Sequence, residues 1–68
     1  MGKIIKKFRK ERKMSQKKLA ELTKVLNQSQ ISKIELGKRT VKEEEVLIFA
    51  RTFKVPIAKL YSMMNSFN

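Results

Sequence analysis

The sequence of 68 residues contains no cysteine, no histidine and no tryptophan, and it has only one proline and two glycines. The absence of thiol and imidazole groups excludes a disulfide, a zinc finger, a cysteine nucleophile and a histidine general base. The longest purely apolar run, residues 46–50, is far shorter than the roughly 20 residues of a membrane-spanning helix. Residues 1–5 lack the hydrophobic region of a signal peptide. We therefore expect a cytoplasmic protein that holds no metal or other cofactor.

Acidic residues are also scarce, with 6 Asp and Glu against 17 Lys and Arg, and the formal net charge is +11. Residues 1–34 hold eleven Lys and Arg and two Glu, whereas residues 35–68 hold six Lys and Arg and four Glu. A concentrated basic surface attracts polyanions, and each phosphate that it neutralises on nucleic acid releases counterions. The charge therefore favours a nucleic acid as the partner, ahead of an anionic lipid surface.

Helices are favoured throughout, because proline and glycine are rare and apolar residues recur at helical spacing. Ser15 is a typical N-cap, and Asn27 with Gln30 has the spacing of a capping box. Thr40 with Glu43 has the same spacing and predicts another helix start. Together these signals predict helices over about residues 3–13, 16–23, 28–36, 41–53 and 56–64.

Three further features support these helix ends. Gly37 suits a left-handed C-cap, and Pro56 suits the start of the last helix. The acidic run at residues 43–45 lies where the helix dipole favours negative charge, so we interpret it as helix-start chemistry rather than a metal site. We expect residues 1–64 to form one domain and residues 65–68 to form a short frayed tail.

The helix expected at residues 28–36 has two chemically different faces. On a helical wheel, Ile31, Ile34 and Glu35 share an arc that would face the core. Gln, Lys and Ser on the opposite arc can hydrogen-bond to base edges in the major groove, although an ordinary solvated face would look similar. An exposed Leu36 on that arc could touch a thymine methyl group, but it needs no function. The predicted base-reading residues are Gln28, Ser29, Ser32 and Lys33.

Groups that can bind phosphate flank this helix on both sides. Lys17 and Lys18 occupy the first turn of the preceding helix, where the dipole disfavours positive charge unless a phosphate is nearby. Basic residues also follow the helix, at positions 38 and 39. The predicted phosphate-binding residues are Gln16, Lys17, Asn27, Lys38 and Arg39.

Two segments carry a resemblance to a known family, namely MSQKKLAE at residues 14–21 and NQSQISKIELGKR at residues 27–39. They resemble the helix-turn-helix of the Xre/Cro-type repressors, and the similarity covers about residues 3–61. The resemblance implies an all-α fold, a compact five-helix lambda-repressor-like DNA-binding domain whose second and third helices form the helix-turn-helix. It also implies that Gln16 contacts a phosphate and braces the reading helix, and that Gln28, Ser29 and Lys33 contact bases.

The resemblance further implies a structural ion pair between Arg9 and Glu35, which would explain why Glu35 lies beside the apolar arc. The chain departs from the family in the turn at residues 24–26, which lacks the usual glycine and is one residue longer. Left-handed geometry at a residue other than glycine costs about 1 to 2 kcal/mol. We expect the extra residue to avoid that geometry.

Apolar residues outside the expected core predict self-association. Ile48 lies among polar residues on its helix, and with Met63 and Phe67 it could form a patch that joins two copies. A two-fold dimer would place two reading helices one DNA turn apart, about 34 Å. We therefore predict a sequence-specific regulator, a repressor, that binds a palindromic operator in double-stranded DNA as a homodimer.

Two other hypotheses stay open. The chain could be an antitoxin-like or accessory protein-interaction module with secondary DNA binding, or residues 3–13 could act as a basic membrane-surface peptide. Catalysis is disfavoured, because Ser and Lys occur only where caps, DNA contacts or solvent already account for them, and we expect no enzyme. No segment suggests a small-molecule ligand.

Overall fold

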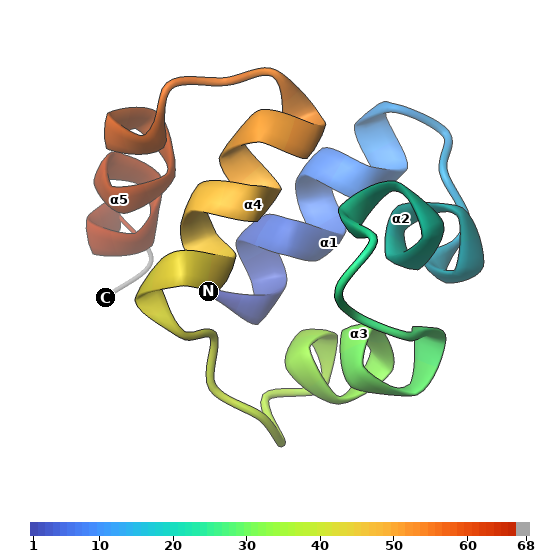
Figure 1. The fold of residues 1–68 in the computed structure, drawn as a ribbon. Helices are drawn as coiled ribbons and strands as arrows, with labels where there is room; N and C mark the ends of the chain where they lie inside the picture. The colour runs from blue at the N-terminus through green and yellow to red at the C-terminus, as the bar shows by residue number, and fades with distance from the viewer. Residues whose placement is uncertain (67–68) are drawn as a thin grey trace.

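The computed structural model describes residues 1–66, with side chains described for residues 1–63. In this part of the chain there are five α-helices and no strand, which confirms the all-α prediction. Figure 1 shows α1 and α4 crossing the centre, with α5 on one side and with α2 and α3 on the other. The helices are α1 (Gly2–Glu11), α2 (Gln16–Thr23), α3 (Gln28–Glu35), α4 (Glu43–Phe53) and α5 (Ile57–Ser66).

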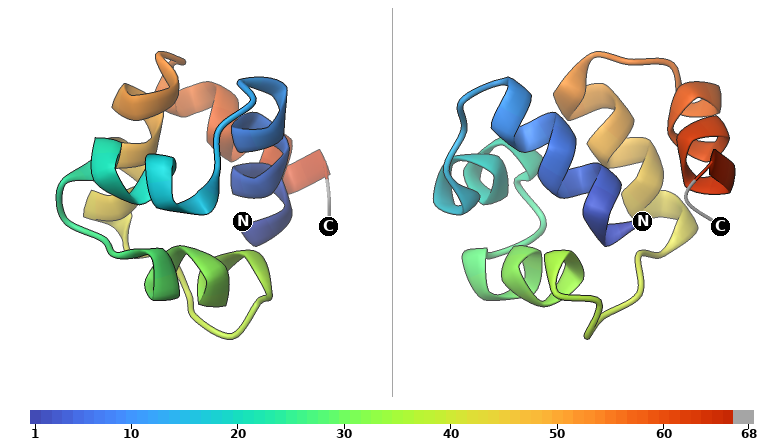
Figure 2. Two further views of the ribbon diagram at one scale, coloured as in Figure 1. Left: turned by 90° about the vertical axis from the view of Figure 1, so that its right-hand side faces the viewer. Right: turned by 180° about the vertical axis from the view of Figure 1, so that it is seen from behind.

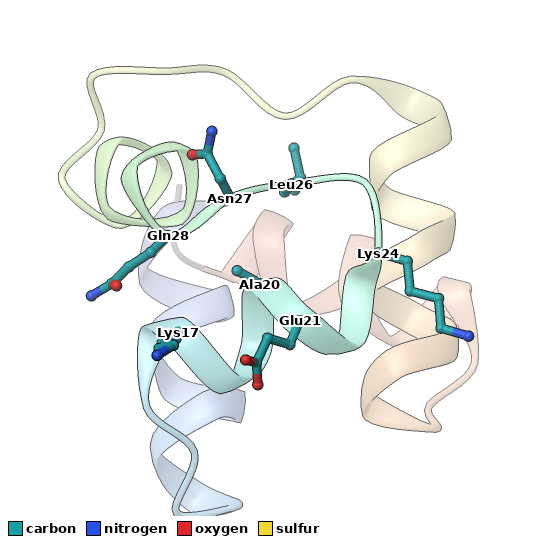
Figure 3. A pocket seen from close by; sticks show the side chains of 7 residues that line it. All are labelled: Lys17, Ala20, Glu21, Lys24, Leu26, Asn27 and Gln28. Atoms are coloured by element: carbon teal, nitrogen blue, oxygen red, sulfur yellow. The ribbon is translucent and has the colours of Figure 1, made fainter.

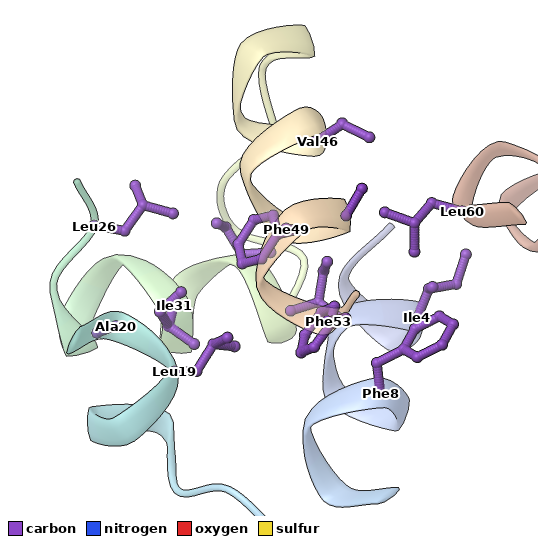
Figure 4. Packing of buried hydrophobic residues seen from close by; sticks show 13 residues of the cluster. Ile4, Phe8, Leu19, Ala20, Leu26, Ile31, Val46, Phe49, Phe53 and Leu60 are labelled. Carbon is purple, nitrogen blue, oxygen red and sulfur yellow. The ribbon is translucent and has the colours of Figure 1, made fainter. Parts of the chain in front are cut away.

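A single hydrophobic core joins all five helices. Phe8 and Phe53 stack with their ring centroids 5.4 Å apart, and Leu60 of α5 is fully buried. Figure 4 shows these side chains meeting between α1, α4 and α5, whereas Leu19 and Ile31 come from α2 and α3. Burying one such large side chain contributes about 1.5 to 3 kcal/mol. The core therefore holds α2 and α3 against the central pair of helices.

Arginine covers one end of this core. The Arg12 guanidinium lies 5.0 Å from the centroid of the Phe8 ring and 5.3 Å from that of Phe53. Arg12 Nη2 also donates a hydrogen bond to the Phe53 carbonyl oxygen at 2.8 Å. These contacts join the end of α1 to the end of α4. The positive charge of Arg12 therefore helps to stabilise the fold.

Two of the predicted helix starts are confirmed in atomic detail. Ser15 Oγ accepts a hydrogen bond from the Lys18 N–H at 2.9 Å. Asn27 Oδ1 accepts from the Gln30 N–H at 2.8 Å, and Gln30 Oε1 accepts from the Asn27 N–H at 2.9 Å. The reciprocal pair satisfies donors that the first turn of α3 cannot satisfy within the helix.

The predicted start of α4 was wrong. The helix begins at Glu43 with Lys42 as N-cap, and Thr40 lies outside it. The Lys42 N–H donates a hydrogen bond to Glu45 Oε1 at 3.0 Å, so the side chain that reaches back belongs to Glu45. The same carboxylate binds Arg39, and this pairing places the helix start two residues after the position that the Thr40 pattern suggested.

Left-handed residues end four of the helices. Gly37 has φ +77°, as predicted for the end of α3. Lys13, Lys24 and Lys54 also have positive φ, of 55°, 64° and 59°. Because Lys24 lies in the longer turn, the expectation that this turn avoids left-handed geometry was wrong. The Lys24 N–H donates a hydrogen bond to the Ala20 carbonyl oxygen at 3.3 Å. The left-handed conformation of Lys24 then ends α2 and lets the chain turn toward α3. A lysine at a helix end is favourable for the dipole, which offsets part of the backbone cost.

The ends of the first and last helices also differ from expectation. The first helix stops at Glu11, because Lys13 has turned left-handed. The last continues to Ser66, through two residues that we expected in the tail, and Phe67 and Asn68 lie outside the described residues. None of the helices in residues 1–66 is both long enough and apolar enough to cross a membrane.

Candidate nucleic-acid interface

Helix α3 lies at one end of the molecule, with its back against α1 and α2 (Figure 2). Its core-facing residues Ile31 and Ile34 are at most 1% exposed. On the outer side, Gln28, Ser29 and Lys33 are exposed and Ser32 is half-buried. The structure therefore places the four predicted base-reading side chains on one accessible face of a helix whose opposite face is packed.

A shallow groove runs along this outer side, and we name it the α3 groove. It also includes Leu36 at the end of α3 and two residues from the flanking segments, Gln16 and Lys38. Leu36 is 67% exposed. The residues that line the α3 groove are Gln16, Gln28, Ser29, Ser32, Lys33, Leu36 and Lys38.

A second surface pocket lies between α2 and the start of α3. Figure 3 shows Lys17 and Gln28 on one side of it and Lys24 on the other. Gln28 therefore borders both depressions, and Lys17, a predicted phosphate-binding residue, lies on the same side of this pocket. The exposed amide and ammonium groups at the starts of the two helices lie on the same side of the molecule.

A buried carboxylate connects three helices behind the α3 groove. Arg9 of α1 binds Glu35 of α3 through two hydrogen bonds, Nε to Oε2 at 2.7 Å and Nη2 to Oε1 at 3.0 Å. Gln16 of α2 donates from Nε2 to the same Oε1 at 3.1 Å. The Arg9 and Glu35 side chains are only 10% and 3% exposed. The predicted ion pair is therefore confirmed, and it holds the end of α3 in a defined orientation.

The electrostatics of this network keep both partners charged. Burial on its own would raise the pKa of Glu35, but the hydrogen bonds from Arg9 and Gln16 outweigh burial and hold that pKa below its ordinary value. The hydrogen bond to Glu35 correspondingly raises the pKa of Arg9. Arg9 Nη1 also donates to the Met14 carbonyl oxygen at 2.8 Å. Among the described side chains, no buried nitrogen or oxygen lacks a hydrogen-bond partner.

A second ion pair, which sequence reasoning missed, engages Arg39. Its Nη1 and Nη2 donate to Glu45 Oε1 and Oε2, both at 2.9 Å. The hydrogen bond from Arg39 lowers the pKa of Glu45 in spite of partial burial. Arg39 and Glu45 are six residues apart across a loop, and no standard sequence motif predicts an ion pair at that spacing. The only sequence signal for the pair was the position of Glu45 in the first turn of α4.

The remaining predicted phosphate-binding residues differ in how they are held. Lys17 and Lys38 are exposed, and neither forms an ion pair in the described structure. Asn27 is exposed, but its side chain serves the capping box of α3. Gln16 braces Glu35, as the family resemblance implied, while it also borders the α3 groove. Their contacts with phosphate stay predictions.

The predicted self-association residues are only partly brought to the surface. Ile48 is half-buried, Met63 packs against the core, and Phe67 lies outside the described residues. Among the side chains that the structure describes, the most accessible large apolar ones on α4 and α5 are others. They are Leu47 at 41%, Ile57 at 36% and Tyr61 at 36% exposure.

Comparisons with known proteins place this geometry in a family. A family model described as "Helix-turn-helix" matches residues 5–60. Among solved structures, the chain resembles the restriction-modification controller protein C.AhdI from Aeromonas hydrophila, with a TM-score of 0.80, 27% identity, and coverage of 87% of this chain and 84% of that chain. The search of curated proteins found no match. Since the family model covers most of the chain, the protein belongs to the helix-turn-helix family, in its Xre, lambda-repressor-like group.

Proposed function

We propose that this protein is a sequence-specific transcriptional repressor that reads the major groove of double-stranded DNA with α3. Family membership and the likeness to a controller protein support DNA binding and transcriptional regulation. One observation supports the finer proposal above all others. Hydrogen-bonding side chains occupy the outer face of α3, while Ile31 and Ile34 bury its inner face and Glu35 fixes its end.

The polar residues of the α3 groove suit this task chemically. Gln28 can form a bidentate pair with adenine, and Lys33 can donate to guanine. Lys17 and Lys38 stand at the two flanks of α3, where they can contact phosphates and set the register of the helix on the duplex. A helix that is held rigidly by the core and by Glu35 loses little conformational freedom when it binds.

A binding assay on DNA selected from a random pool tests sequence reading. We expect Gln28→Ala to cost about 1 to 3 kcal/mol and to relax the preference at one base position. Lys38→Ala should weaken binding to all sequences alike and reduce the salt slope by about 1. Lys59→Ala, on the exposed side of α5, is the matched control and should leave both quantities unchanged. Binding that depends on salt alone and ignores sequence would overturn the proposal.

We propose a homodimer because two copies related by a two-fold axis would match the symmetry of a palindromic operator. We propose that Ile48 of α4, with Met63 of α5, forms the contact between two copies, so that the selected DNA is palindromic. Sedimentation of the DNA complex should give two chains per site for the wild type and one for Ile48→Lys. Leu22→Lys, on α2, is the control. A wild-type complex with one chain per site would contradict the dimer.

Repression is proposed because a bound dimer on an operator that overlaps a promoter would exclude polymerase. In vitro transcription from such a template should fall as the protein is added, and Gln28→Ala should shift the effect to higher concentration. A rise in transcription would instead assign the protein as an activator.

A further inference from the structure

One residue of the α3 groove, Leu36, is chemically unlike the others. Among the large hydrophobic residues of the described part it has the highest exposed fraction, 67%. It follows Gln28 and Ser32 at intervals of four residues, so the three side chains form one ridge along α3. On the helical wheel it lies about 80° from Gln28, near the middle of the arc that the predicted reading residues span. Leu36 therefore points in the same direction as the reading face.

The end of α3 fixes this direction. Leu36 has helical backbone angles, φ −84° and ψ −3°, and its N–H bonds to the Ser32 carbonyl oxygen at 3.0 Å. The next two N–H groups close the helix, Gly37 to Ile34 at 3.0 Å and Lys38 to Lys33 at 2.8 Å. This is a Schellman closure, with Gly37 in the left-handed position. Leu36 cannot turn toward the core unless this closure breaks.

The chemistry of the major groove limits what such a side chain can meet, and here the inference rests on the proposed function. When α3 enters the major groove, Leu36 and its polar neighbours all lose their contact with water. Most of the groove floor consists of hydrogen-bond donors and acceptors, which an apolar side chain would desolvate without replacing their bonds. The apolar exception is the 5-methyl group of thymine. Contact with that methyl group buries apolar surface on both partners.

We propose that Leu36 reads the 5-methyl group of a thymine and so requires that base at one position of each half-site. The residue adds a specificity that hydrogen bonding does not supply, because a methyl group has no donor or acceptor. Removing one buried methyl group from such a contact weakens binding about fourfold.

Replacing single thymines by uracil in the selected site tests the proposal, because the two bases differ only in the methyl group. The wild type should lose affinity about fourfold at one thymine per half-site. Leu36→Ala should bind the thymine-containing site more weakly and should no longer distinguish thymine from uracil at that position. The substitution removes an exposed side chain, so we expect the fold to be kept. Leu22→Ala, 41% exposed and outside the α3 groove, is the control and should retain the discrimination.

The possible results separate this inference from the proposed function. Equal affinity for thymine and uracil at every position, in a protein that still prefers its selected site and still responds to Gln28→Ala, would overturn the role of Leu36 alone. Discrimination that survives in Leu36→Ala would assign the methyl contact to another side chain and also overturn it. A wild type without any sequence preference would overturn both proposals together.

Discussion

The ion pair between Arg9 and Glu35 allows a quantitative test of how α3 is held. Replacing Arg9 by Met keeps the apolar stem but leaves a carboxylate that is 3% exposed with Gln16 as its remaining side-chain donor. Breaking a buried pair in this way costs about 3 to 5 kcal/mol. A domain of this length is stable by roughly 3 to 10 kcal/mol, so Arg9→Met should lose a large part of its free energy of unfolding.

The opposite change should be milder. Glu35→Gln keeps the shape of the side chain and one acceptor oxygen, and Arg9 keeps its bond to the Met14 carbonyl oxygen. We expect a loss of about 2 kcal/mol, as for a charge-assisted hydrogen bond. The double variant strands neither charge, so its loss should be smaller than the sum of the single losses. The coupling energy should be about 2 kcal/mol.

Urea unfolding of the wild type, both single variants and the double variant at neutral pH measures this coupling. The pair between Arg39 and Glu45 is a matched control, since its side chains are more exposed, at 23% and 10%. Its coupling energy should be smaller than that of Arg9 and Glu35, because solvent screens the more exposed pair. Additive losses for Arg9 and Glu35, or a coupling no larger than in the control pair, would refute the conclusion that this pair clamps α3.

Three further predictions concern pH, backbone conformation and close packing. Hydrogen bonds from Arg9 and Gln16 hold the folded-state pKa of Glu35 below the ordinary value. The contribution of Glu35 to stability should therefore be complete above about pH 5 and should be lost as pH falls through the folded-state pKa. Acid unfolding curves that are the same for the wild type and Glu35→Gln would contradict this. Lys24→Gly should raise the free energy of unfolding by about 1 kcal/mol, since glycine adopts the left-handed conformation without strain, whereas Lys7→Gly within α1 should lower it by about 1 kcal/mol in the same urea experiment. Gly2→Ala should lower the melting temperature, because a Cβ at residue 2 would overlap the Ile34 carbonyl oxygen. Alanine is a better helix former than glycine, so a higher melting temperature would show that there is space for the Cβ and would contradict this prediction.

Features that depend on a few neighbouring residues could be predicted from the sequence. The N-caps Ser15 and Asn27, the left-handed Gly37 and the two faces of α3 all follow from interactions within about one helical turn. The exposed position of Gln28 follows from the same periodicity. The pairing of Arg9 with Glu35 required more, because the two residues are 26 positions apart, and it was predicted only through the resemblance to a known family.

Local patterns could not choose between alternatives that the whole fold decides. Thr40 and Lys42 each stand three residues before a glutamate, and the choice of Lys42 accompanies the pairing of Glu45 with Arg39. Lys24 becomes left-handed because α3 must pack against α1 and α2 at a set angle, and burial of the shared core outweighs the local backbone cost. By itself, then, the sequence determined which segments are helical and which side of each is polar. Only the tertiary structure decided which charges pair and which side chains share the α3 groove, because these depend on where separate helices meet.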